Sequence, residues 1–266
     1  MLKKLVKNGY MTLVFVFLYA PVAVLIVFSF NSAKSRAVWG GFTLEWYRKL
    51  FQNDDILQAL EVTLTVALIS AVVSTFVATL TCIGLNAMRR RLRQAIMNVT
   101  YIPNISPDLV TGISLMLLFF FIRMQTGFAT LLLAHIAFNI PYAILSISPK
   151  LKQLDRNLFE AALDLGCRPY QAIIKVILPE IMPGIVTALI LTFTLSIDDF
   201  VISYFTAGNQ ISTLAITIYS MARKSVNPQI NALSALMFVS VLILLLLVNS
   251  RTNRDLNASK NGGNAK

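Results

Sequence analysis

The chain has 266 residues, of which 56% are hydrophobic and 13% are charged, and its mean hydropathy is +0.71. A water-soluble domain of this length cannot hide so much apolar surface, so part of the chain must face lipid. This excludes a fully water-soluble enzyme or binding domain. The two cysteines, Cys82 and Cys167, are too few to form a disulfide framework.

Six apolar runs predict an all-α membrane protein with six transmembrane helices, because each run approaches the roughly 20 residues that cross a bilayer. We expect these helices to form a transmembrane domain over residues 1–250, followed by a disordered cytosolic tail at 251–266 that is rich in Asn, Lys and Gly. In chain order, the expected spans cover residues 10–30, 62–87, 99–122, 128–148, 184–205 and 232–248.

The first span is expected to be retained, because no small-residue cleavage site follows it. The polar loop after it carries Trp39, Trp46 and Tyr47, aromatic residues that suit a membrane interface. Pro103 and Pro107 interrupt the first half of the third span, which is therefore expected to be irregular.

The basic residues predict the orientation of the chain. With six spans, both termini and the loops at 88–98 and 149–183 lie on one side, which carries 16 of the 23 lysines and arginines. That side is expected to be cytosolic. The net charge of +11 is then a topology signal, with lipid headgroups rather than nucleic acid as its partner. The other side carries seven: Lys34, Arg36, Arg48, Lys49, Arg123, Arg223 and Lys224.

A polar segment at 154–183 lies between the fourth and fifth spans and is patterned like packed structure. Apolar residues recur at helical spacing, Gly166 suits a helix C-terminus, and Pro169 suits the first turn of a second helix. Pro179 and Pro183 are expected to end that second helix. The segment therefore predicts two short helices joined at a glycine, although an ordinary surface hairpin would share this pattern.

This segment resembles the EAA loop of ABC importer permeases. The resemblance rests on Glu160-Ala161-Ala162, on Gly166 after three intervening residues, and on the Val176-x-Leu178-Pro179 sequence, in which the family usually has isoleucine at the first position. It implies the fold of a type I ABC importer permease. It also implies that Glu160, Ala161, Ala162 and Gly166 couple the chain to an ATP-binding subunit through a helix that inserts into that subunit.

Three acidic residues lie in or beside the spans, where a carboxylate is costly and usually faces a pathway or a protein interior. They are Asp108, Asp198 and Asp199. Asp108 follows Ser106-Pro107, so it also suits the start of a helix. Asp198 and Asp199 are neighbours, so one is expected to face a pathway while the other caps a helix, pairs with a partner chain or reaches the outer interface.

These carboxylates favour a cationic cargo, to which Tyr19, Tyr204 and Phe205 could add cation–π contacts, although packing explains the aromatic residues equally well. His135 is interpreted as a hydrogen-bonded structural histidine. The sequence contains no phosphate-binding glycine loop with a lysine, no nucleophile–base set and no metal-ligand spacing. We therefore expect no enzymatic activity and no cofactor in this chain, with ATP and Mg bound by a partner.

Longer stretches resemble the polyamine permeases of this family, which transport spermidine and putrescine. The resemblance implies an inner-membrane complex with a second homologous permease, two copies of the ABC ATP-binding subunit and a periplasmic polyamine-binding protein. The stretches that carry it are FSFNSAK at 28–34, GFTLEWY at 41–47, SPDLVTGISL at 106–115, FTLSIDDFVIS at 193–203 and NPQINALS at 227–234.

Three other functions remain compatible with the residues alone. An ABC permease for another small solute, such as iron, sulfate or an amino acid, would share the coupling loop, although an anion importer should place basic residues in its spans. A cation-coupled secondary carrier would suit the aspartates but not a structured cytosolic hairpin. A purely structural scaffold would have little reason to keep three carboxylates in lipid.

Overall fold

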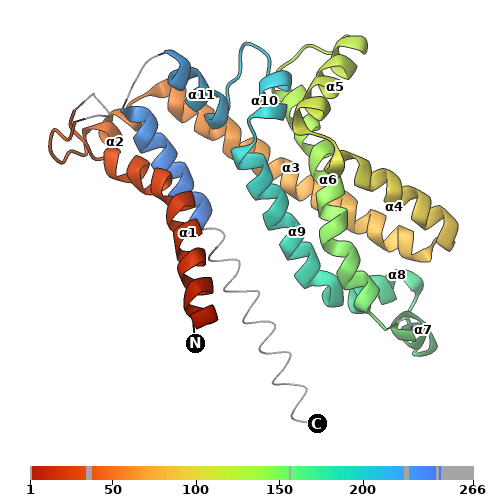
Figure 1. Cartoon of the computed structure of the whole chain (residues 1–266). Coiled ribbons are helices and arrows are strands. Elements are labelled where there is room, and N and C mark those ends of the chain that lie inside the picture. Colours follow the sequence, from red (N-terminus) through yellow and green to blue (C-terminus); the bar gives the residue numbers. More distant parts are fainter. Residues whose placement is uncertain (1, 34–37, 156, 225–227, 244–245, 247–266) are drawn as a thin grey trace. The chain divides into compact units, whose positions relative to one another are not determined.

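The computed structural model describes residues 2–33, 38–155, 157–224, 228–243 and 246, and every regular element in those ranges is a helix (Figure 1). The expected tail at 251–266 and the end of the sixth expected span lie outside the described residues. The chain divides into two compact units. Unit 1 comprises residues 1–58 and 217–247, and unit 2 comprises residues 59–216 and 248–266.

Unit 1 is built on a long N-terminal helix and on the loop that follows it. Its helical elements are α1 (Leu2–Phe28), α2 (Glu45–Leu50), the first turn of α3, most of α11 (Leu214–Lys224) and the helix Gln229–Ile243. The Asn31 side chain organises the loop: its amide nitrogen donates to the Val38 carbonyl at 2.8 Å, and its amide oxygen accepts from the Gly40 N–H at 2.7 Å.

The aromatic residues of this loop do not share one environment. Trp46 is buried, and its indole N–H donates to the Asn31 carbonyl at 2.7 Å. The Tyr47 hydroxyl lies 2.7 Å from the Ser29 hydroxyl oxygen, within hydrogen-bonding distance. Trp39 is half exposed. Trp46 therefore joins the two ends of the loop inside unit 1, and its place relative to a membrane interface stays a prediction.

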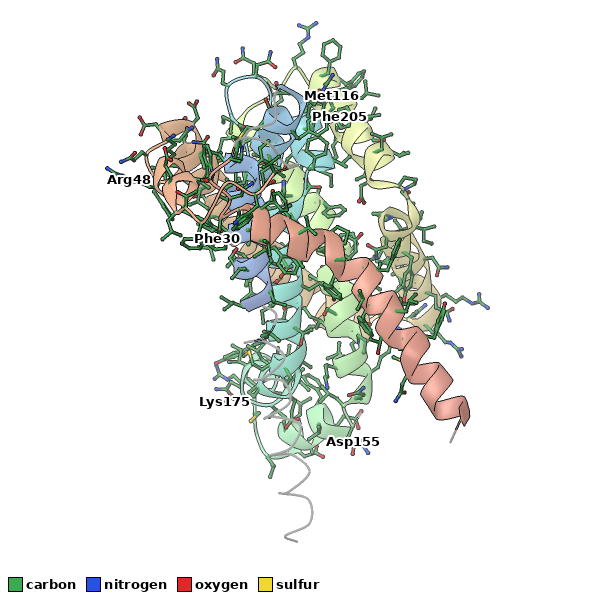
Figure 2. All side chains as sticks on the ribbon, turned by 60° about the vertical axis from the view of Figure 1, so that its left-hand side comes forward. Phe30, Arg48, Met116, Asp155, Lys175 and Phe205 are labelled. Carbon is green, nitrogen blue, oxygen red and sulfur yellow. The ribbon has the colours of Figure 1, made fainter. Side chains whose placement is uncertain are left out.

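Unit 2 contains a pair of long helices, α6 and α9, that run side by side, with α5 and α10 at one end and α7 and α8 at the other (Figures 1 and 2). Figure 2 labels Met116 and Phe205 at the first end and Asp155 and Lys175 at the second. The elements are α3 (Asp54–Ala87), α4 (Arg90–Ile105), α5 (Asp108–Phe121), α6 (Phe128–Gln153), α7 (Asn157–Asp164), α8 (Pro169–Ala172), the π-helix η1 (Ile173–Ile177), α9 (Leu178–Asp198) and α10 (Val201–Thr206).

The core of unit 2 lies where α3, α6 and α9 meet. Cys82, Ile147 and Ile181 belong to one buried apolar cluster that joins these helices. Gly184 allows α9 to approach α6 closely, because a methyl group there would come to 2.9 Å from Lys150 Cγ. The packing fixes α6 and α9 against each other, so both ends of this pair hold their attached elements in defined positions.

Four helices within the described residues are long and apolar enough to cross a membrane: Lys7–Phe28, Asp54–Ala87, Phe128–Gln153 and Pro169–Asp198. A fifth candidate is the pair of α4 and α5, which is bent by 106°. The expected third span at 99–122 is therefore not one helix. Its break follows from Pro107, which disfavours the helical conformation in the preceding residue, and Ser106 is accordingly extended, with ψ of 138°.

The end of the polar segment also differs from the expectation. Pro179 and Pro183 do not end a helix, because the helix that begins at Pro169 continues through η1 and α9 to Asp198. A proline normally clashes with the carbonyl four residues earlier, which here is Lys175. The wide turn of η1 lies at that carbonyl and accommodates Pro179. At its other end the expected fifth span, 184–205, is interrupted after Asp198 before α10 begins.

Candidate functional site

The three predicted aspartates lie at helix ends in unit 2. Asp108 is the first residue of α5, Asp198 is the last residue of α9, and Asp199 begins the break that precedes α10. Gly112, one turn into α5, packs against α10: a methyl group there would lie 3.4 Å from the Val201 carbonyl oxygen. This contact brings the start of α5 next to the break between α9 and α10.

The Asp199 carboxylate is the cap of α10. It accepts hydrogen bonds from the backbone N–H groups of Ile202 at 3.3 Å and Ser203 at 2.8 Å. These donors have no partner inside the helix, so a carboxylate at this position stabilises the first turn. The side chain is only 8% exposed, and one of its oxygens lies 3.6 Å from Nε2 of His135. Asp199 is therefore committed to structure within unit 2.

Asp108 and Asp198 differ from Asp199 in exposure and pairing. Both are exposed in the isolated chain, and neither forms an ion pair with any of the described residues. Asp108 lies in the first turn of α5, where its charge also offsets unpaired backbone donors. Asp198 lies at the C-terminal end of α9, where a negative charge is unfavourable for the helix dipole. The helix itself therefore does not explain the carboxylate of Asp198.

The two predicted tyrosines belong to different units. Tyr204 lies on α10, half exposed, with its ring centroid 5.4 Å from that of Phe200 and 5.5 Å from that of Phe205. It shares the unit and the neighbourhood of the aspartates. Tyr19 lies on α1 of unit 1, exposed and stacked on Phe15. The structure therefore brings Tyr204, but not Tyr19, into the same unit as Asp108, Asp198 and Asp199.

Buried polar side chains next to the break form a network that the sequence did not single out as a site. Asn139 of α6 donates to the Ser196 hydroxyl at 2.8 Å and to the Ser70 hydroxyl at 3.3 Å. Nε2 of His135 lies 3.0 Å from the Ser203 hydroxyl. The expectation that His135 is hydrogen-bonded is confirmed. The sequence contained a signal for this network, because His135 and Asn139 are polar residues four apart within an apolar run and therefore lie on one helix face.

The predicted coupling residues lie on α7 and on the turn after it. Gly166 has φ of 85°, the Gly166 N–H donates to the Leu163 carbonyl, and the Cys167 N–H donates to the Ala162 carbonyl. This pair of hydrogen bonds is a Schellman motif, which requires a left-handed residue and favours glycine. Glu160 and Ala161 are exposed, whereas Ala162 is buried. Leu165, which is not among the predicted coupling residues, is 86% exposed.

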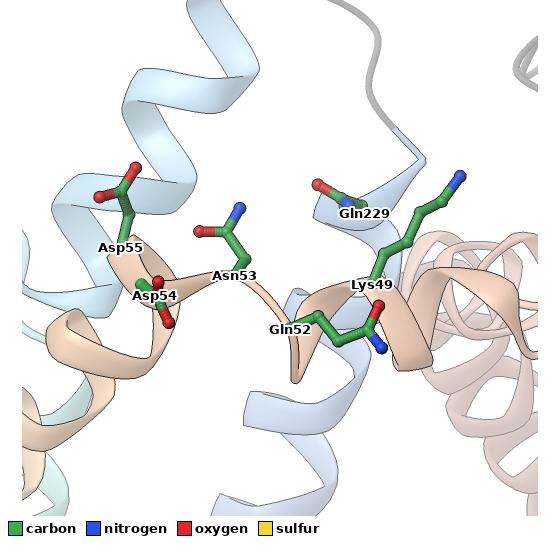
Figure 3. A pocket seen from close by; sticks show the side chains of 6 residues that line it. All are labelled: Lys49, Gln52, Asn53, Asp54, Asp55 and Gln229. Carbon is green, nitrogen blue, oxygen red and sulfur yellow. The ribbon is translucent and has the colours of Figure 1, made fainter.

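Unit 1 has an open polar pocket of about 490 Å³ that contains none of the predicted residues (Figure 3). Its lining combines acidic side chains at the start of α3 with a lysine of α2. That lysine, Lys49, pairs with Glu45 at 2.6 Å and lies 5.1 Å from the centre of the Trp46 ring. The pocket is lined by Lys49, Gln52, Asn53, Asp54, Asp55 and Gln229.

Comparison with known proteins gives consistent matches. The family model described as "Binding-protein-dependent transport system inner membrane component" matches residues 78–253. The spermidine/putrescine transport system permease protein PotC of Shigella flexneri is 38% identical over 266 residues, which is 100% of both chains. The putrescine transport system permease protein PotI of Escherichia coli (strain K12) is 38% identical over 85% of this chain and 83% of that protein.

A solved structure supports the fold alone. A chain of the bacterial alginate ABC transporter, crystallised with a periplasmic protein bound to alginate pentasaccharide, aligns with a TM-score of 0.73 and 16% identity over 95% of this chain and 94% of that one. The expected all-helical fold of a type I ABC importer permease is confirmed. By its helices and its relatives, the chain is a multi-pass inner-membrane protein. It belongs to the family of inner membrane components of binding-protein-dependent transport systems.

Proposed function

We propose that the chain is a permease subunit of an ATP-driven importer for the polyamines spermidine and putrescine. The observation that carries the proposal is the exposed Asp198 carboxylate, which has no ion pair among the described residues and precedes the helix α10 that packs against α5, the helix that Asp108 begins. The resemblance to spermidine/putrescine and putrescine permeases supports this choice of cargo.

A polyamine needs several carboxylates at intervals along its length. Asp108 and Asp198 belong to different helices and supply two such groups, and the second permease would supply others. Tyr204 and its aromatic neighbours on α10 provide ring faces for the cation–π contacts of an ammonium group. Asp199 supports the pathway by capping α10, and Tyr19 would contribute from α1.

Members of this family work with an ATPase and a substrate-binding protein. We propose that this chain pairs with a second homologous permease, two copies of the ATP-binding subunit and a periplasmic polyamine-binding protein. ATP and Mg would be bound by the ATP-binding subunits, so this chain takes part in transport without its own hydrolytic site. The distribution of basic residues favours both termini in the cytosol.

Coupling would use the exposed face of α7. Glu160 and Ala161 point away from the core of unit 2, and Leu165 adds an exposed apolar side chain next to the Gly166 turn. Leu165 would then be covered when the ATP-binding subunit contacts this face of α7. Ala162 and Gly166 would act indirectly, since they fix the position of α7 on unit 2.

The experiment measures uptake of radiolabelled spermidine and putrescine in cells that lack this chain and every other polyamine importer. Restoring the wild-type chain should restore uptake. Asp198→Asn should lower uptake about tenfold at low substrate concentration, since a hydrogen bond to a charged group contributes about 1.5–3 kcal/mol. Asp55→Asn removes the same charge from an exposed position of unit 1 and should retain wild-type uptake. Unchanged uptake when the wild-type chain is restored would refute the polyamine assignment.

A further inference from the structure

Two side chains of α6 hold both sides of the break between α9 and α10. Asn139 donates to the Ser196 hydroxyl at 2.8 Å, two residues before Asp198. Nε2 of His135 lies 3.0 Å from the Ser203 hydroxyl, in the first turn of α10. His135 and Asn139 are four residues apart and therefore lie on one face of α6.

These contacts are buried. Asn139 and Ser203 are fully buried, and His135 is 1% exposed. Polar side chains in such a setting are costly unless they are paired, and a broken membrane helix leaves backbone groups that need partners. Ser196 and Ser203 find their side-chain partners on α6, in Asn139 and His135. The position of the α9–α10 break therefore depends on α6 as well as on the residues of the break itself.

Asp199 connects the two contacts. Its carboxylate accepts from the Ser203 N–H at 2.8 Å and lies 3.6 Å from Nε2 of His135. Ser203 is therefore held at its backbone by Asp199 and at its hydroxyl by His135. Asp198 lies between Ser196, which Asn139 holds, and Asp199, which caps α10. Of the two aspartates at the break, Asp198 is the exposed one.

We propose that His135 and Asn139 are positioning residues, which set the location of the Asp198 carboxylate by fixing where α9 ends and α10 begins. The inference rests on the proposed function in one respect, namely that Asp198 contacts the cation. Neither residue touches the cargo. Both act through the break, so their replacement should weaken cargo binding without removing any charge from the pathway.

The first test measures position and is independent of the cargo. In the assembled complex, with Cys82 and Cys167 replaced by alanine, spin labels are attached through Asp198→Cys and Lys152→Cys, on α9 and on the far end of α6. The label separation is on the order of 20 Å from the helix rise, which suits pulsed electron paramagnetic resonance. His135→Leu and Asn139→Leu should each broaden the distance distribution at least twofold.

Two variants serve as controls for this measurement. His135→Gln keeps a side-chain amide that can donate to or accept from the Ser203 hydroxyl, and it should keep the narrow distribution. Thr192→Val also removes a buried hydroxyl from α9, but that hydroxyl bonds only within its own helix, to the Ala188 and Leu189 carbonyls. It should leave the distances unchanged. Narrow and unshifted distributions in both leucine variants would overturn the proposal.

The second test measures transport by the intact complex, corrected for the amount assembled. His135→Leu should raise KM for spermidine at least fivefold, while Vmax and basal ATPase activity stay within twofold of wild type. His135→Gln should restore KM. In an Asp198→Asn background, His135→Leu should add no further increase in KM, since residues that act through one another are not additive. An equal increase in both backgrounds would overturn the proposal.

The two tests separate the inference from the proposed function. Broadened distances in a complex that imports no polyamine would contradict the cargo and leave the positioning role standing. Normal polyamine uptake by the wild-type complex, together with unchanged distances in the leucine variants, would support the cargo and contradict the positioning role. A merely structural role, in which the variants assemble poorly but every assembled complex has wild-type KM, would overturn the positioning role.

Discussion

Gly112 of α5 lies close to Val201 of α10, because a methyl group on Gly112 would lie 3.4 Å from the Val201 carbonyl oxygen. The contact joins two segments that are about 90 residues apart in the sequence. Asp108 begins one segment, and Asp198 and Asp199 precede the other. The acidic groups of the proposed pathway therefore share a neighbourhood because a glycine lets two helices approach closely.

Substitutions of Gly112 test this contact. Gly112→Ala should be tolerated with a modest loss of uptake, because the added methyl group would meet the Phe205 ring at 3.1 Å and a side chain can shift. Gly112→Leu should lower spermidine uptake at least tenfold, since a larger side chain forces α10 away from α5. Gly84→Leu is the matched control, because nothing lies within 4 Å of a methyl group there. Equal uptake by the two leucine variants would contradict the argument.

Adjacent alanines on α7 should give opposite phenotypes. Ala162 is buried, so Ala162→Leu should overpack unit 2 and destabilise the permease by about 1–3 kcal/mol. Ala161 is exposed, so Ala161→Leu should leave the thermal stability of the permease unchanged but reduce cargo-stimulated ATPase activity through its effect on docking. The measurements are thermal unfolding of the purified permease and ATPase activity of the reconstituted complex. If both variants lose stability equally, α7 does not present Ala161 to a partner.

The sequence was sufficient to predict the class of fold and the glycine turn after α7. Apolar runs of bilayer length and the spacing around Gly166 are local signals, and the structure contains both the long helices and the left-handed glycine. Helix ends were harder to predict. The continuation through Pro179 depends on the π-helix η1, whereas Pro107 marks where the helix breaks but not the 106° angle between α4 and α5.

The site was predicted in part, because the acidic residues are visible in the sequence but their environments are not. Asp198 and Asp199 look equivalent as neighbours. Only the fold shows that Asp199 faces two backbone donors and His135, whereas Asp198 stays exposed. The importance of Gly112 also depends on α10, which lies far along the chain and leaves no local pattern.

Replacing Trp46 in unit 1 should give a graded loss of stability. Trp46→Phe keeps most of the buried ring but removes the N–H donor to the Asn31 carbonyl, so it should cost about 1 kcal/mol. Trp46→Ala also removes the ring and should cost about 3–5 kcal/mol. Thermal unfolding of the purified complex measures both changes. Trp39→Ala, at a half-exposed ring, is the control and should cost less than either variant.

Gly166 should tolerate asparagine better than alanine. Nothing lies within 4 Å of a methyl group built on Gly166, so steric overlap does not restrict this position, and its φ of 85° is the constraint. A left-handed conformation costs roughly 1–2 kcal/mol for alanine but less for asparagine, whose side chain can hydrogen-bond locally. Gly166→Ala should therefore lower cargo-stimulated ATPase activity several-fold by loosening the end of α7, and Gly166→Asn should retain most of it. Equal losses of ATPase activity in the two variants would contradict this argument. They would indicate that a partner contacts Gly166 directly, because the preference of asparagine for the left-handed conformation would then make no difference.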